Sequence, residues 1–157
     1  MTKEELKDYG IKVTQASRTG LISLTFDLAI RYLEEAVGEH KKGNDEEFRN
    51  CLCKSKAFIN ELSSSLDMQY EISVRLLSLY IFIYKAMVKA DIKKDASELV
   101  RIIEMLKKLR DAFEEAGKNT SQEPVMENTQ RLYAGLTYSK TSLNEEIYSD
   151  TNRGFTV

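Results

Sequence analysis

The chain has 157 residues, of which 42% are hydrophobic and 31% charged, and its net charge is −2. This length and composition suit one globular domain and exclude collagen-like, disulfide-scaffold and largely disordered chains. The slightly acidic balance argues against a nucleic-acid-binding module, which normally carries a basic stripe. No apolar run approaches the roughly 18 residues that cross a bilayer. The charged N-terminus predicts no signal peptide, so we expect no direct membrane insertion.

The predicted architecture is all-α, because the single proline, Pro124, leaves nearly the whole chain free to be helical. Ser17, Asn44 and Asp95 are the expected N-caps of the first, second and fourth helices. Short connections make neighbouring helices antiparallel, which predicts an up-and-down four-helix bundle. A strand over residues 76–84 is disfavoured because that run lies within a long helical segment and has no partner strand. Helical periodicity between turn signals places the four helices at residues 18–42, 45–65, 70–92 and 96–116.

The chain divides into three predicted segments. Residues 1–16 are expected to form a short N-terminal lid, and residues 17–117 the helical bundle. Residues 118–157 form a polar C-terminal extension that still carries scattered apolar residues. Two readings of this extension stay open, since it either packs on the bundle or is partly disordered. We expect the bundle to fold without it.

Two of the predicted helices are more apolar than a corner position in a bundle requires. Apolar residues cover about 240° of the first helix, whereas a corner helix needs little more than a 100° stripe. The third helix is apolar all round between Arg75 and Lys85. Either a fifth segment covers these helices in a tightly packed core, or a partner helix fills a groove between them.

Residues suited to catalysis or metal binding are scarce. His40 is the only histidine, and Val37 stands where a Glu-x-x-His pair would need its glutamate. Cys51 and Cys53 point about 200° apart on a helix, so they cannot chelate a metal as a pair or bond to each other. No phosphate-binding glycine loop is present. The sequence therefore predicts no catalytic residue, no metal site and no cofactor.

Several stretches resemble one known family. The run Val13–Ser17, followed by Leu21–Leu33, is similar to the opening of the FliS family of flagellin export chaperones. Glu61–Asp67, Ala90–Asp95 and Leu109–Phe113 are also similar to that family, in the same order. The resemblance covers about residues 9–116.

The sequence departs from the family pattern at a few positions. Arg18 replaces a proline, Phe26 a tyrosine, Leu28 a glycine, and Gln15 the usual threonine. These departures indicate a divergent member of the family.

The resemblance implies a cytoplasmic helical chaperone that binds the disordered C-terminal segment of flagellin. Such a chaperone prevents premature polymerisation and helps to deliver flagellin to the membrane export gate, which is a second expected partner. We expect the free protein to be a monomer or a weak dimer. One alternative is a structural module that homodimerises through its apolar helices. The other is a carrier of a small ligand, which Tyr80 and Tyr84 would orient inside the bundle. The residues expected to contact the partner are Tyr9, Ile11 and Val13 in the lid, Leu21, Ile22 and Phe26 in the first helix, and Ile81, Ile83, Tyr84 and Val88 in the third.

Overall fold

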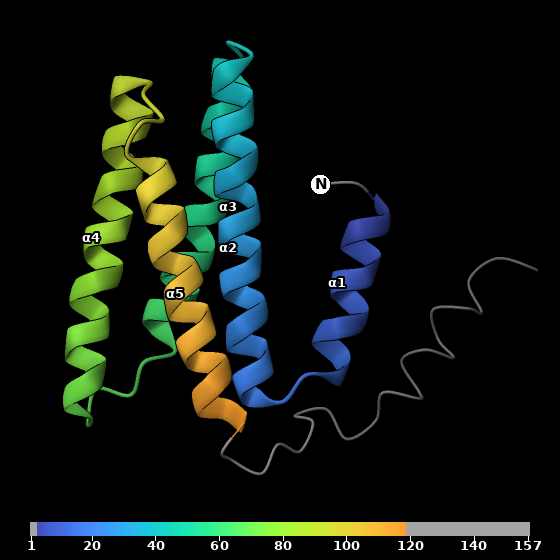
Figure 1. The fold of residues 1–157 in the computed structure, drawn as a ribbon, viewed down its shortest axis with the longest axis vertical. Helices are drawn as coiled ribbons and strands as arrows, with labels where there is room; N and C mark the ends of the chain where they lie inside the picture. Colours follow the sequence, from blue (N-terminus) through green and yellow to red (C-terminus); the bar gives the residue numbers. More distant parts are fainter. Residues whose placement is uncertain (1–2, 119–157) are drawn as a thin grey trace, which may run out of the picture. The chain divides into compact units, whose positions relative to one another are not determined.

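The computed structural model describes residues 3–118, which lie in one compact unit and contain helices but no strand (Figure 1). The prediction of an all-α fold is confirmed. The expectations for the C-terminal extension concern residues that lie outside this described range, apart from Lys118 itself. In chain order the helices are α1 (Lys3–Gln15), α2 (Arg18–Lys41), α3 (Asp45–Ser64), α4 (Glu71–Lys93) and α5 (Leu99–Lys118).

Two of the three predicted N-caps are confirmed. The Ser17 side chain accepts a hydrogen bond from the backbone N–H of Gly20 at 3.2 Å, at the start of α2. Asn44 does the same for the N–H of Glu47 at 3.4 Å, at the start of α3. Each cap satisfies one of the backbone donors that a helix N-terminus leaves without a partner.

The third predicted cap is wrong. Asp95 accepts hydrogen bonds from the N–H and the hydroxyl of Ser97, both at 2.9 Å, and so stabilises a turn. Helix α5 begins only at Leu99. Asp and Ser form such local turns as readily as caps, and the sequence does not distinguish the two.

The N-terminal segment is more ordered than predicted. Residues expected to form only a polar lid form helix α1, which packs against α2. An ion pair of 2.6 Å joins Glu5 of α1 to Arg31 of α2. Half-buried Tyr9 lies near this pair. Burial, and then the charge of Asp27, raises the pKa of the Tyr9 hydroxyl.

Helices α2 to α5 share one hydrophobic core. α2 packs against α3 and α5, whereas α4 packs against α3 and more sparingly against α5. Figure 1 shows that consecutive helices from α2 to α5 run in opposite directions. With neighbours on fewer sides, α4 leaves part of its surface uncovered within the described residues. The large side chains at the centre of the core are Phe26, Leu33, Phe48, Leu52, Ile59, Tyr80, Ile83, Met87, Leu99 and Leu106.

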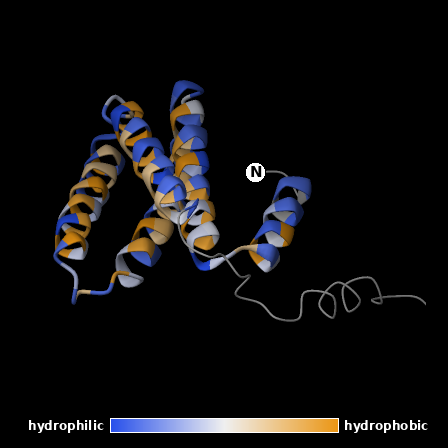
Figure 2. Ribbon diagram, turned by 60° about the horizontal axis from the view of Figure 1, so that its bottom comes forward, coloured by the Kyte–Doolittle hydropathy of each residue, from blue (hydrophilic) through white to orange (hydrophobic). Residues whose placement is uncertain are grey.

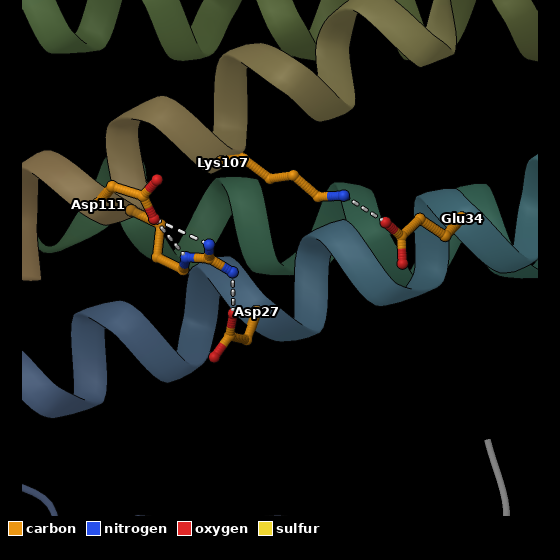
Figure 3. Close-up of polar contacts among 5 residues, drawn as sticks. Asp27, Glu34, Lys107 and Asp111 are labelled. Carbon is orange, nitrogen blue, oxygen red and sulfur yellow. Dashed lines mark hydrogen bonds and ion pairs between the residues drawn. The ribbon is translucent and has the colours of Figure 1, made fainter.

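Ion pairs at the surface fix how α5 lies on α2 (Figure 3). Arg110 donates to Asp27 at 2.8 Å, and Lys107 donates to Glu34 at 2.7 Å. Arg110 also binds Asp111 of its own helix, and these carboxylates, Asp27 first, raise the pKa of its guanidinium. Two such pairs, whose residues are seven positions apart on α2 and three apart on α5, favour a single register of the two helices.

A second set of ion pairs joins α3 to α4. The Asp91 carboxylate accepts from Arg49 at 3.0 Å and from Lys56 at 3.2 Å. Partial burial by itself raises the pKa of Asp91, but the hydrogen bonds from Arg49 and Lys56 outweigh it, and the pKa is lowered.

This lowered pKa predicts a pH-dependent contribution to stability. A carboxyl whose pKa is lower in the folded state stabilises the fold above its unfolded pKa, near 3.9, and loses that contribution as pH falls through the folded value. We expect Asp91→Asn to lower the free energy of unfolding by about 1–2 kcal/mol at pH 7. The difference from the unsubstituted chain should shrink below about pH 4. Urea unfolding at pH 7 and pH 3 measures this, and an equal difference at both values would contradict the assignment.

Candidate partner-binding surface

Helix α4 exposes large apolar side chains along its length. Five residues at its start and middle each leave 45% or more of their surface exposed, and Figure 2 shows hydrophobic residues along the visible side of this helix. Several large apolar residues exposed on one helix are typical of an interaction surface, because leaving them in water costs free energy. They are Tyr70, Ile72, Val74, Ile81 and Phe82.

Part of this surface is hollowed into a groove between α3 and α4, of about 480 Å³. We call it the α3–α4 groove. Its α4 wall is formed mainly by apolar residues, and its α3 wall by small polar ones. The groove is lined by Leu77, Tyr80, Ile81, Tyr84, Lys85 and Val88 from α4, and by Asn60 and Ser63 from α3.

The two walls offer different chemistry. The Ser63 hydroxyl of the α3 wall donates its hydrogen to the Ile59 carbonyl at 2.8 Å, so this hydrogen is not available to a partner. Burial raises the pKa of Tyr80 to about 12, so its hydroxyl stays neutral at physiological pH. Exposed Lys85 supplies a positive charge on the α4 side. An apolar segment with an acidic flank would match these features.

The ion pairs of Asp91 lie at one end of the groove. Asp91 lies just under one helical turn beyond Val88 on α4, and its carboxylate binds Arg49 and Lys56 of α3. They hold the two walls together at this end.

A second hollow, of about 540 Å³, lies between the start of α2 and the end of α3. Its apolar residues are Leu21, Ile22 and Leu62, and its charged residues include Arg18 and Glu61. We call it the α2–α3 hollow. The predicted partner surface on the first and third predicted helices, which are α2 and α4, is therefore divided between two sites that lie on either side of α3.

The structure corrects two of the predicted contact residues. Phe26 and Ile83 are each 0% exposed and belong to the core, so neither side chain is accessible to a partner. The sequence could not show this, because both residues occur in helices that are apolar on most sides.

The other predicted contact residues lie in three places. Ile81, Tyr84 and Val88 line the α3–α4 groove. Leu21 and Ile22 line the α2–α3 hollow. Tyr9, Ile11 and Val13 are half-buried in α1.

Sequence reasoning missed Leu77 and Val74 of α4 and the whole α3 wall. The signal for Val74 and Leu77 was present, since Tyr70, Val74, Leu77, Ile81, Tyr84 and Val88 alternate at spacings of four and three residues. The α3 wall carried no such signal, because small polar residues such as Asn60 and Ser63 occur on any solvated helix face.

The histidine and the two cysteines of the described residues lie in different surroundings. Within residues 3–118, no group of three His, Cys, Asp or Glu side chains is placed to hold a metal ion. His40 packs its ring 5.3 Å from that of Phe48. Cys51 is buried and Cys53 exposed, both as free thiols. Burial, followed by the charge of Glu35, raises the pKa of Cys51, which disfavours the reactive thiolate.

An apolar groove between two helices is typical of proteins that bind a segment of another protein. None of the helices in residues 3–118 is long and apolar enough to cross a membrane. Residues 5–120 match the family model of flagellar protein FliS. The chain is also similar to the flagellar secretion chaperone FliS of Bacillus subtilis (strain 168), with 24% identity over 104 residues that cover 66% of this chain and 78% of the relative. The chain belongs to the FliS family.

Proposed function

We propose that the chain is a cytoplasmic flagellar export chaperone that binds the disordered C-terminal segment of flagellin. In this proposal the segment occupies the α3–α4 groove, which prevents premature polymerisation. The complex is then delivered to the flagellar type III export apparatus, where the export gate is a second partner. The observation that carries the proposal is the exposed apolar groove in a member of the FliS family. The Bacillus subtilis relative is named a flagellar secretion chaperone, which supports a role in flagellar export.

The energetics of the groove favour such a partner. Burying a large apolar side chain contributes roughly 1.5–3 kcal/mol, and the exposed part of Ile81 would gain a share of this on binding. A disordered segment loses conformational entropy when it folds on a surface, so several such contacts are needed for stable binding. The antiparallel packing of α2 to α5 provides the rigid support that holds these contacts in place.

Light scattering of the full chain with and without a flagellin C-terminal peptide tests the proposal. We expect a one-to-one complex, and calorimetry should show a negative heat-capacity change because the buried surface is apolar. A peptide of the same length with its large apolar residues replaced by serine is the matched control and should not bind. The proposal fails if the native peptide leaves the scattering mass and heat unchanged.

Helix α1 is proposed to act as a lid over apolar surface when flagellin is absent. Its packing on α2 and the half-buried Tyr9, Ile11 and Val13 support this role. Deleting residues 1–16 should therefore increase binding of a hydrophobic dye severalfold and favour self-association.

A control substitution distinguishes the effect of removing helix α1 from the effect of losing its ion pair with α2. Glu5→Gln weakens the ion pair with Arg31, whose two side chains are both partly exposed, and should change stability by less than about 1 kcal/mol. Dye binding that stays unchanged after the deletion would show that α1 covers no apolar surface.

A further inference from the structure

Tyr80 is the most deeply buried of the residues that line the α3–α4 groove. It is only 1% exposed, whereas the other lining residues are half-buried or exposed. The Tyr80 ring packs in the core, where its centroid lies 6.3 Å from that of Phe26. The ring is therefore held in place by the core, and the little of Tyr80 that is accessible opens into the groove.

The Tyr80 hydroxyl has no hydrogen-bond partner among residues 3–118. Its raised pKa has burial as its cause, and no hydrogen bond or neighbouring charge contributes. No fully buried polar side-chain atom of the described residues lacks a partner. The hydroxyl oxygen must therefore be the accessible part of this side chain, and it is reached through the groove that Tyr80 lines.

A segment that covered the groove with apolar side chains alone would bury this hydroxyl without a partner. A donor that is removed from water without gaining an acceptor weakens binding by about tenfold or more. The occupant should therefore carry an acceptor where it crosses Tyr80. In a helical segment most backbone carbonyls are already bonded within the helix, so this acceptor has to be a side chain.

The α3 wall of the groove offers acceptors. The Ser63 hydroxyl donates its hydrogen to the Ile59 carbonyl, which leaves its Oγ atom as an acceptor. Asn60 on the same wall makes no side-chain hydrogen bond within the described part of the chain, so its amide oxygen is also available. The groove thus presents a donor from α4 and acceptors from α3.

We propose that the α3–α4 groove recognises an uncharged carboxamide, the side chain of an Asn or Gln, on the apolar face of the flagellin segment. The carboxamide oxygen accepts from the Tyr80 hydroxyl, and the carboxamide NH2 group donates to Ser63 Oγ. Asn and Gln carry an acceptor and a donor on adjacent atoms of one neutral group. A carboxylate has no donor for Ser63, and burying its charge costs free energy.

This inference rests on the proposed function and deepens it, because it names the chemistry by which the segment is positioned. Apolar side chains can fit an apolar groove at several positions along a helix. A single polar contact at the centre permits one position, as a buried asparagine does in a coiled coil. Tyr80 is therefore a specificity-determining residue, whereas the apolar lining residues supply most of the affinity.

A double-mutant cycle tests the contact, with affinities of the full chain for the flagellin C-terminal peptide measured by calorimetry. Each Asn and Gln of the peptide is replaced in turn by leucine, and one of these replacements should weaken binding about tenfold. Tyr80→Phe should weaken binding of the native peptide by a similar factor. The two changes together should bind within about threefold of the original pair, because neither polar group is then left without a partner.

The α3 side of the contact is tested at the same position of the peptide. Replacing the sensitive carboxamide by a carboxylate of the same length should weaken binding about tenfold, because the charge is buried and Ser63 loses its donor. Ser63→Ala should weaken binding of the native peptide and leave the leucine-substituted peptide unaffected. A carboxylate peptide that binds as tightly as the native one would overturn the role given to Ser63.

Tyr32→Phe is the matched control. It removes the same hydroxyl from a buried tyrosine of α2 that lines neither the α3–α4 groove nor the α2–α3 hollow. Peptide affinity should then change by less than about twofold. Tyr80→Phe should keep the melting temperature of the free protein, because its hydroxyl makes no hydrogen bond there. This measurement distinguishes a recognition role from a structural one.

The outcomes separate this inference from the proposed function. If the native peptide binds but the effects of Tyr80→Phe and of every carboxamide replacement simply add, the carboxamide contact is wrong and flagellin binding stands. If the native peptide does not bind the unsubstituted chain, the proposed function fails, and the carboxamide contact fails with it.

Discussion

Ile81→Asp is expected to abolish binding of the flagellin peptide while leaving the helical fold intact. Ile81 is 45% exposed, so water can solvate the introduced carboxylate in the free protein. In the complex the carboxylate would be buried against an apolar segment, and an unpaired buried charge costs several kcal/mol. We therefore expect the affinity to fall by at least about 100-fold. Calorimetry measures the affinity, and circular dichroism with thermal melting checks the fold.

Val100→Asp on α5 is the matched control for this substitution. Val100 is 53% exposed, and it lines neither the α3–α4 groove nor the α2–α3 hollow. Its replacement introduces the same charge at a similar exposure, so peptide affinity should change by less than about twofold. Equal loss of binding in both variants would indicate a general effect of charge, and normal binding by Ile81→Asp would place the flagellin site away from this groove.

Phe26→Ala is expected to destabilise the whole helical unit by about 3–5 kcal/mol, without a specific effect on the partner surface. The Phe26 ring is fully buried, and its centroid lies 5.5 Å from that of Phe113 and 6.3 Å from that of Tyr80. Removing the ring leaves a cavity where α2, α4 and α5 meet. Urea unfolding followed by circular dichroism measures the loss.

Phe82→Ala makes the same chemical change on the surface and serves as the control. Phe82 is 54% exposed, so the substitution should lower the free energy of unfolding by less than about 1 kcal/mol. Phe26→Ala protein that remains folded should still bind the flagellin peptide, because Phe26 does not reach the surface. A Phe26→Ala variant as stable as the unsubstituted chain would contradict the position of this ring in the core.

Much of the fold could be read from the sequence because its signals are local. Ser17 and Asn44 cap helices where they were expected to do so, since a cap depends on a side chain and a backbone N–H only three residues apart. The turn at Gly43, which adopts a positive φ of 74°, is also local. The end of α4 lies one residue beyond its predicted position, although Lys94 takes the left-handed conformation that glycine usually takes there.

The sequence by itself determined that this chain is helical, that its third predicted helix has more apolar surface than a core requires, and that it resembles the FliS family. It could not say which apolar stripe of α4 faces inward. One stripe passes through Ile83 and Met87 and the other through Ile81 and Val88, and both have helical spacing. Only the tertiary structure decided between them, because α3 and α5 cover the first stripe and leave the second open. Helical spacing describes the faces of one helix, whereas accessibility depends on neighbours that are distant in the chain.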